Sequence, residues 1–191
     1  MKKILLIIAF ILCIFQMVVL ATAIDIGSAA INRNSSVTYG YTLINKDNPA
    51  NESGKITSVD IWANVSLTSC QIATFFVVSG DNLSTRDTYY IGTVQLGFKR
   101  TFTVDLDVQA GDYIGIYYPS GEIESNDTGY SGVWFSSGDL IPCTNHGFST
   151  QSGDTMSLYG IGATTPAGVT WNGIVITKWN GIEITIPLNT Q

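Results

Sequence analysis

Short runs of alternating apolar and polar residues recur along the chain after residue 23, separated by Gly, Asn, Asp and Ser. In the clearest run Phe102, Val104, Leu106 and Val108 occupy one set of alternate positions, and Thr, Asp and Gln occupy the other. Successive side chains of a β-strand point to opposite faces of its sheet. This period of two therefore predicts a strand with one buried face and one solvated face.

Further runs rich in β-branched and aromatic residues are "KITSVDIWANVSL", "CQIATFFVVSG", "DYIGIYY", "SGVWF" and "MSLYGIG". The second of these is nearly continuous in apolar residues, which predicts a central strand covered on both faces. No stretch after the N-terminal segment shows the period of an amphipathic helix. Many short strands joined by Gly-rich turns predict an all-β chain, a β-sandwich with jelly-roll connections.

A small residue followed by Gly-Asp occurs four times, beginning at residues 79, 110, 137 and 152. Gly adopts positive φ without steric cost, and Asp can accept a hydrogen bond from the backbone two residues further on, so turns are the favoured interpretation. Calcium is the alternative, but such a site needs six or more convergent oxygens, usually from a dense local run. None of the four stretches has one, and no cofactor is predicted.

The C-terminal stretch "WNGIVITKWNGI" contains the phrase Trp-Asn-Gly-Ile twice. Asn-Gly between alternating apolar residues is a strong hairpin signal, so residues 171–187 are predicted to form a β meander. It follows a Thr-, Pro- and Gly-rich linker, residues 163–170. The meander either packs onto its own domain or pairs with a sheet of another subunit. The candidate assembly residues are Trp171, Ile174, Ile176, Trp179, Ile182 and Ile184.

The N-terminus carries Lys2 and Lys3, an apolar run from Ile4 to Ala21, and a small-x-small site that ends at Ala23. These features predict a secretory signal peptide over residues 1–23, with the β-sandwich domain over 24–162. An uncleaved membrane anchor is the alternative, because ~17 apolar residues can just span a bilayer. Either way the domain is expected outside the cytoplasm, with membrane contact only through this segment.

Charge and cysteine content narrow the function classes. Without Lys2 and Lys3, 7 of the 9 Lys and Arg remain against 15 Asp and Glu, a net charge of −8. An acidic chain without a basic run is not expected to bind nucleic acid.

Cys70 and Cys143 are the only cysteines after the signal, and an oxidising compartment predicts a disulfide between them. Candidate glycosylation sites are Asn34, Asn51, Asn64, Asn82 and Asn126.

Three patterns are candidate catalytic sites. Asp105 and Asp107 lie two apart on a predicted strand, where glycosidase carboxylates could stand, but a solvated face is the simpler interpretation. "GEIESND" faintly resembles the acidic strand of jelly-roll glucanases, although Asn126 replaces the expected acid/base. His146 has no evident nucleophile partner and too few companions for zinc. The chain is therefore predicted to be non-catalytic, with a divergent glycoside hydrolase as a further alternative.

A sugar-binding surface would need aromatic rings beside polar groups. The aromatic candidates either serve as such a platform or fill the sandwich core. The candidate ligand-binding residues are Tyr113, Tyr117, Asn126, Asp127, Tyr130, Trp134 and Asp139.

The stretches "VQAGDYIGIYY" and "SGVWFSSGD", with the repeated "WNGI", resemble secreted or virion-associated jelly-roll proteins of prokaryotes and their viruses. The resemblance covers roughly residues 56–186. It implies glycan recognition or surface assembly. The predicted function is extracellular contact, by recognition of a glycan or another cell-surface component. The alternative is self-assembly as a homo-oligomer in a filament, layer or virion.

Overall fold

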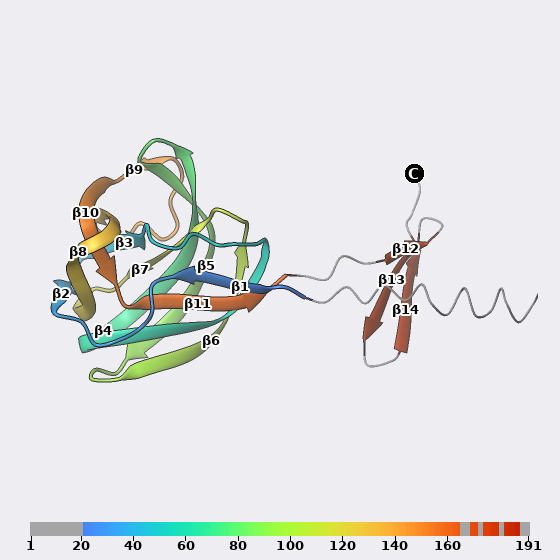
Figure 1. Cartoon of the computed structure of the whole chain (residues 1–191), viewed down its shortest axis with the longest axis horizontal. Helices are drawn as coiled ribbons and strands as arrows, with labels where there is room; N and C mark the ends of the chain where they lie inside the picture. Colours follow the sequence, from blue (N-terminus) through green and yellow to red (C-terminus); the bar gives the residue numbers. More distant parts are fainter. Residues whose placement is uncertain (1–20, 165–168, 172–173, 180–181, 188–191) are drawn as a thin grey trace, which may run out of the picture. The chain divides into compact units, whose positions relative to one another are not determined.

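The computed structural model describes residues 21–164 and the strand residues 169–171, 174–179 and 182–187 (Figure 1). All elements of this part are β-strands, which confirms the all-β prediction, and it holds no helix long and apolar enough to cross a membrane. Most of the predicted signal segment, residues 1–20, lies outside the described residues. The strands are β1 Ala23–Gly27, β2 Ser35–Thr38, β3 Tyr41–Asn45, β4 Gly54–Ser79, β5 Asn82–Val94, β6 Lys99–Val108, β7 Tyr113–Tyr117, β8 Ser120–Ser137, β9 His146–Gly147, β10 Ser149–Met156, β11 Leu158–Ala163, β12 Val169–Trp171, β13 Ile174–Trp179 and β14 Ile182–Pro187.

The strands fall into two compact units. Thr22–Thr165 contains β1 to β11, and the second unit contains β12 to β14, so the division falls inside the predicted linker. In the second unit β13 pairs antiparallel with both β12 and β14. Trp171 pairs with Ile174 and Trp179 pairs with Ile182, so two residues connect each pair of strands. The predicted C-terminal meander is confirmed.

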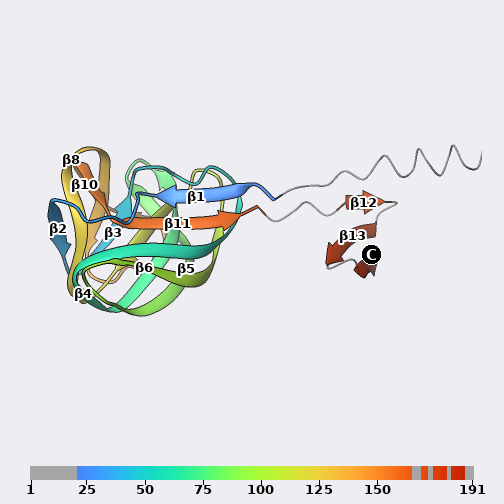
Figure 2. The ribbon, with the colours of Figure 1, turned by 60° about the horizontal axis from the view of Figure 1, so that its bottom comes forward.

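The larger unit is a β-sandwich in which one long strand belongs to both sheets. The first part of β4 pairs with β6 and β11, and its later part pairs with β5 and β7. The first sheet has the order β1-β11-β4-β6, and the second has the order β5-β4-β7-β3-β8-β10. Figure 2 shows β1 and β11 side by side in the first sheet.

Sequence patterns predicted two strands, near residues 55–67 and 70–80, where the structure has the single strand β4. The pairing of β4 with β5 shifts register between Leu67 and Cys70, and Ser69 has a φ of 46°. Such an irregularity bends a strand and increases its twist without ending it. The chain therefore passes from one sheet to the other through a bend.

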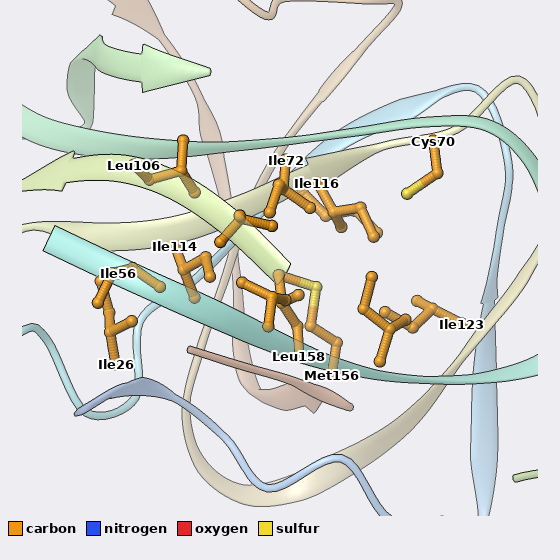
Figure 3. Close-up of a cluster of buried hydrophobic side chains, with 14 of the residues drawn as sticks. Ile26, Ile56, Cys70, Ile72, Leu106, Ile114, Ile116, Ile123, Met156 and Leu158 are labelled. Carbon is orange, nitrogen blue, oxygen red and sulfur yellow. The ribbon is translucent and has the colours of Figure 1, made fainter. Parts of the chain in front are cut away.

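The main core lies between the two sheets, and Figure 3 shows its side chains. The predicted inward face of β6 is confirmed, because Val104, Leu106 and Val108 are buried and Phe102 packs partly against the same cluster. Ile26 from β1 and Ile56 from β4 belong to this cluster too. Burial of large aliphatic side chains, at roughly 2 kcal/mol each, is the main force that holds the sheets together.

A second, smaller cluster involves β3, β4, β5, β8 and the segment that follows β8, with β7 packed partly against it. It contains Phe75, Leu83, Trp134, Ile141 and Phe148. On β4, Ile72 belongs to the main core whereas the next residue, Ala73, belongs to the second cluster. This part of β4 is therefore covered on both faces, as its nearly continuous apolar sequence predicted.

The predicted disulfide between Cys70 and Cys143 is wrong, because both cysteines are free. Cys70 is buried in the main core beside Gly92 of β5, whereas Cys143 packs against the second cluster and hydrogen bonds with Thr85 of β5. Gly92 and Thr85 are roughly 20 Å apart along an extended strand. Disulfide-bonded cysteines need Cα atoms within about 7 Å. The two thiols are too far apart to join.

Three of the four Gly-Asp stretches lie where a strand ends and the chain turns, as predicted. Gly111 and Gly138 have φ values of 89° and 92°, and Asp139 accepts a hydrogen bond from the backbone of Ile141, two residues further on. The fourth stretch lies inside β10, where the pairing with β8 shifts register on both sides of Gly153. It forms an irregularity in a strand, and the prediction of a turn there is wrong.

Candidate functional site

The candidate residue Tyr130 is part of an internal polar network. Arg33 donates a hydrogen bond to its hydroxyl at 3.1 Å, Asn126 donates another at 3.4 Å, and the Arg33 guanidinium lies over its ring. These bonds lower the pKa of the Tyr130 phenol, Arg33 having the larger effect. Asn126 also accepts a hydrogen bond from the backbone of Asn34. Tyr130 and Asn126 thus fasten β8 to the chain before β2, while Asp127 is exposed beside them.

Trp134 belongs to the second cluster and is only 5% exposed. Its ring packs edge-on against Tyr113 with the centroids 4.9 Å apart, and its indole N–H donates a 2.7 Å hydrogen bond to Asp81. The Lys46 ammonium lies over the same ring, 4.4 Å from the centroid. The sequence left open whether Trp134 forms a platform for a sugar or fills the core. The structure supports core packing.

The remaining two candidates, Tyr117 and Asp139, come together around Gln71 of β4. The Gln71 amide donates a 2.8 Å hydrogen bond to the Asp139 carboxylate, and Gln71 pairs with Tyr117 on β7 and with Tyr90 on β5. Residues directly opposite on neighbouring strands present their side chains on the same face. We call Gln71, Tyr90, Tyr117 and Asp139 the Gln71 cluster.

Tyr90 is the most exposed large hydrophobic side chain in residues 21–164, at 63%. A Cβ at Gly92 would lie 3.7 Å from the Tyr90 ring, so the ring lies close to this glycine. Gly92 has a φ of 82°, a conformation that strongly favours glycine. A bare backbone next to the ring leaves much of the ring open to a ligand.

Several polar groups of the Gln71 cluster make no internal hydrogen bond within the described part of the chain. These groups are the hydroxyls of Tyr90 and Tyr117 and the side-chain carbonyl of Gln71, whereas both Asp139 oxygens accept one bond each. Tyr117 packs in part against the second cluster, and Asp139 is exposed. An exposed ring beside unoccupied donors and acceptors is the arrangement that a sugar or another hydroxylated ligand requires.

Sequence reasoning missed Gln71 and Tyr90. They are separated from Tyr117 and Asp139 by 27 residues or more in the chain, and pairing of β4 with β5 and β7 brings them together. No local motif marks this arrangement. The signal that could have found it is the pair Tyr89-Tyr90, an aromatic doublet in a polar stretch.

The candidate catalytic residues occupy three different environments. Asp105 and Asp107 both bind the Lys55 ammonium, at 2.9 and 2.8 Å, with their side chains 74% and 61% exposed. Glu122 accepts hydrogen bonds from Ser36 and Asn64, which lower its pKa. His146 shares a 3.1 Å hydrogen bond with Ser136. Within the described residues, no group of three or more His, Cys, Asp and Glu side chains could hold a metal ion.

Four of the five candidate glycosylation sites use their side-chain amides in hydrogen bonds. Asn51, Asn64, Asn82 and Asn126 donate to neighbouring oxygens. Asn34 is exposed, and its side chain makes no hydrogen bond to another described residue. A glycan at Asn34 would thus disturb the fewest internal contacts, and glycosylation stays a prediction.

The register of the meander divides the candidate assembly residues between two faces. Trp171 pairs with Ile174, which shares a face with Ile176. Trp179 pairs with Ile182 on the opposite face, and Ile184 alternates with Ile182 on that same side. Each face of this small sheet therefore carries three of the six candidates.

In comparisons with known proteins, no model of a protein family matches the chain, and no curated protein matches it.

Proposed function

We propose that this protein is a secreted, non-catalytic β-sandwich that binds a glycan of a cell surface through the Gln71 cluster. The observation that carries the proposal is the exposed ring of Tyr90 beside the unoccupied polar groups of Gln71 and Tyr117. A pyranose ring has a face of C–H groups and a rim of hydroxyls. The aromatic ring would pack on that face, and the amide and the Asp139 carboxylate would bind the hydroxyls.

Other parts of the chain support the same class of function without defining the ligand. The N-terminal segment has the features of a secretory signal, and the acidic composition opposes binding of nucleic acid. The resemblance to secreted or virion-associated jelly-roll proteins agrees with surface recognition, and jelly-roll connectivity remains a prediction. The exposed carboxylates of β6 are engaged by Lys55.

A glycan array with matched variants tests the proposal. Tyr90→Ala removes the exposed ring and is expected to weaken glycan binding about tenfold, the equivalent of ~1.4 kcal/mol. Tyr89→Ala is the control, because Tyr89 is the adjacent residue and pairs with Ile72 of the main core, so it belongs to the opposite face of the sheet. Failure of the wild-type chain to retain any glycan, or equal binding by Tyr90→Ala, would refute the proposal.

Self-assembly is the second candidate function, and the register of the meander favours it. Both faces carry apolar residues, and the only charged pair, Lys178 and Glu183, shares a face with Ile174 and Ile176. A three-stranded sheet this small is marginally stable unless another surface covers it. An uncharged face that contains Trp179, Ile182 and Ile184 would be covered by a second copy of the chain.

The two candidate functions separate in one measurement. Size-exclusion chromatography with light scattering compares the chain that ends at Thr165 with the chain that ends at Gln191. An oligomer formed only by the longer chain supports assembly through the meander. A monomer in both cases, with glycan binding retained, supports recognition by the sandwich alone.

A further inference from the structure

The loop between β5 and β6 exposes large apolar side chains on a fixed backbone. Leu96 and Phe98 are 51% and 48% exposed, and Val65 on β4 is 45% exposed. The Leu96 N–H donates to the Ser66 hydroxyl at 3.1 Å, and the N–H of the next residue donates to the Ala63 carbonyl at 3.0 Å. These bonds attach the loop to the stretch of β4 that contains Val65, just before its bend. We call Val65, Leu96, Phe98 and Arg100 the loop tip.

Arg100 gives the loop tip a cation that forms no ion pair and no side-chain hydrogen bond with another described residue. Its guanidinium carbon lies 3.4 Å from the centroid of the Phe98 ring, and its Nε is buried without a hydrogen bond. Every other Lys and Arg in residues 21–164 forms a side-chain hydrogen bond or an ion pair with another described residue. A guanidinium matches the geometry of a phosphate with two parallel N–H donors.

We propose that the loop tip binds a phospholipid surface. Leu96 and Phe98 would enter the boundary between headgroups and acyl chains, while the Arg100 guanidinium would bind a lipid phosphate. A lipid interface accepts a projecting loop without a matched cavity, which a protein partner would have to supply. This contact goes beyond the proposed glycan site, and it differs from the expectation that only the N-terminal segment meets a membrane.

The acidic composition of the chain restricts the proposed membrane contact to the region around Arg100. A net charge of −8 for the chain after residue 23 repels anionic surfaces. Next to the loop tip, Lys99 is neutralised by Asp60 at 3.0 Å, whereas Arg100 forms no ion pair with another described residue. The molecule would therefore meet a membrane through this one end.

Co-sedimentation with vesicles tests the proposal. The vesicles are phosphatidylcholine with a minor fraction of phosphatidylglycerol, and the protein is residues 22–191. Removal of residues 1–21 excludes insertion of the N-terminal segment, and the sandwich retains all its strands and both clusters. Wild-type protein is expected to sediment with the vesicles. The double variant L96S/F98S is expected to bind at least about tenfold more weakly, because interfacial binding scales with buried apolar area.

The matched control is the double variant V77S/V78S, which removes two side chains of β4 that are 41% and 47% exposed. This control should sediment like the wild type. Arg100→Gln should weaken binding to a smaller extent, and high salt should remove the difference. Absence of wild-type sedimentation, or equal loss in both double variants, would overturn the proposal. Tyr90→Ala should leave lipid binding unchanged, which keeps this result separate from that of the glycan array.

Discussion

Asp112 is buried against Arg86, and two nitrogens of the Arg86 guanidinium donate hydrogen bonds to the two oxygens of the Asp112 carboxylate. The second of these bonds is 2.9 Å long. Asp112 also accepts a 2.8 Å hydrogen bond from the backbone N–H of Gln109. The pair connects β5 to the turn between β6 and β7, and this bidentate form is the strongest type of side-chain ion pair.

Replacement of Asp112 by Asn should lower the free energy of unfolding by about 3 kcal/mol, because it leaves the Arg86 charge without its buried partner. Urea unfolding followed by circular dichroism measures the change. Asp105→Asn is the control, since that carboxylate is exposed and its Lys55 partner keeps Asp107. An equal loss of unfolding free energy in both variants would show that burial of Asp112 does not strengthen its ion pair with Arg86.

Thiol alkylation should distinguish the two cysteines of the folded domain. Cys143 is half-buried, whereas Cys70 is completely buried in the main core. Iodoacetamide is expected to modify Cys143 first and Cys70 only after denaturant is added, as peptide mass spectrometry would reveal. Recovery of a Cys70–Cys143 disulfide peptide from the untreated protein would refute the arrangement of these strands.

Stability should fall in alkaline solution. Burial raises the pKa of the Cys70 thiol, so the folded protein keeps this proton to a higher pH than the unfolded chain does. The contribution is complete below the pKa of an unfolded thiol, about 8.5, and it decreases as the pH rises above that value. Burial of the Tyr118 phenol raises its pKa and acts in the same direction above about pH 10.

Cys70→Ala checks the assignment of this pH dependence. The variant will be less stable at every pH because it leaves a cavity. Its free energy of unfolding should nevertheless change less than that of the wild type between about pH 8.5 and 10. Denaturant titrations across this range give both slopes, and parallel slopes would show that Cys70 is not the group responsible.

Tyr130→Phe should affect the fold and not the proposed glycan site. The substitution removes the hydroxyl that accepts hydrogen bonds from Arg33 and Asn126 and keeps the ring beneath the Arg33 guanidinium. A small decrease in the melting temperature is expected, with unchanged glycan binding. Loss of binding in this variant would move the ligand from the Gln71 cluster to the Tyr130 network.

Sequence patterns predicted features that depend on which face a residue occupies. The alternation of Phe102, Val104, Leu106 and Val108 placed the inward face of β6 correctly, because a period of two has one simple structural meaning. The Asn-Gly pairs likewise predicted the meander, because Asn-Gly between two apolar runs strongly favours the tight turn of a β-hairpin. Such local rules involve only neighbouring residues.

Features that depend on pairing between distant strands were not predictable in the same way. Cys70 and Cys143 looked like partners because no other cysteine remained, yet their distance depends on where each meets β5. The Gln71 cluster is a similar case, since its members come from three strands and a loop. Prediction of such sites requires the order of strands in the sheet, which no run of residues specifies.

The pairing of β1 with β11 determines how the sandwich would respond to a pulling force. Ala23 and Ala163 are directly opposite at the open end of this antiparallel pair, so the first and last strands of the sandwich begin and end at the same corner (Figure 1). Tension applied between Ala23 and Ala163 would load the hydrogen bonds of the pair one after another, beginning at this end. The domain would then yield from this corner at low force, and the loss of β1 would also take Ile24 and Ile26 out of the main core.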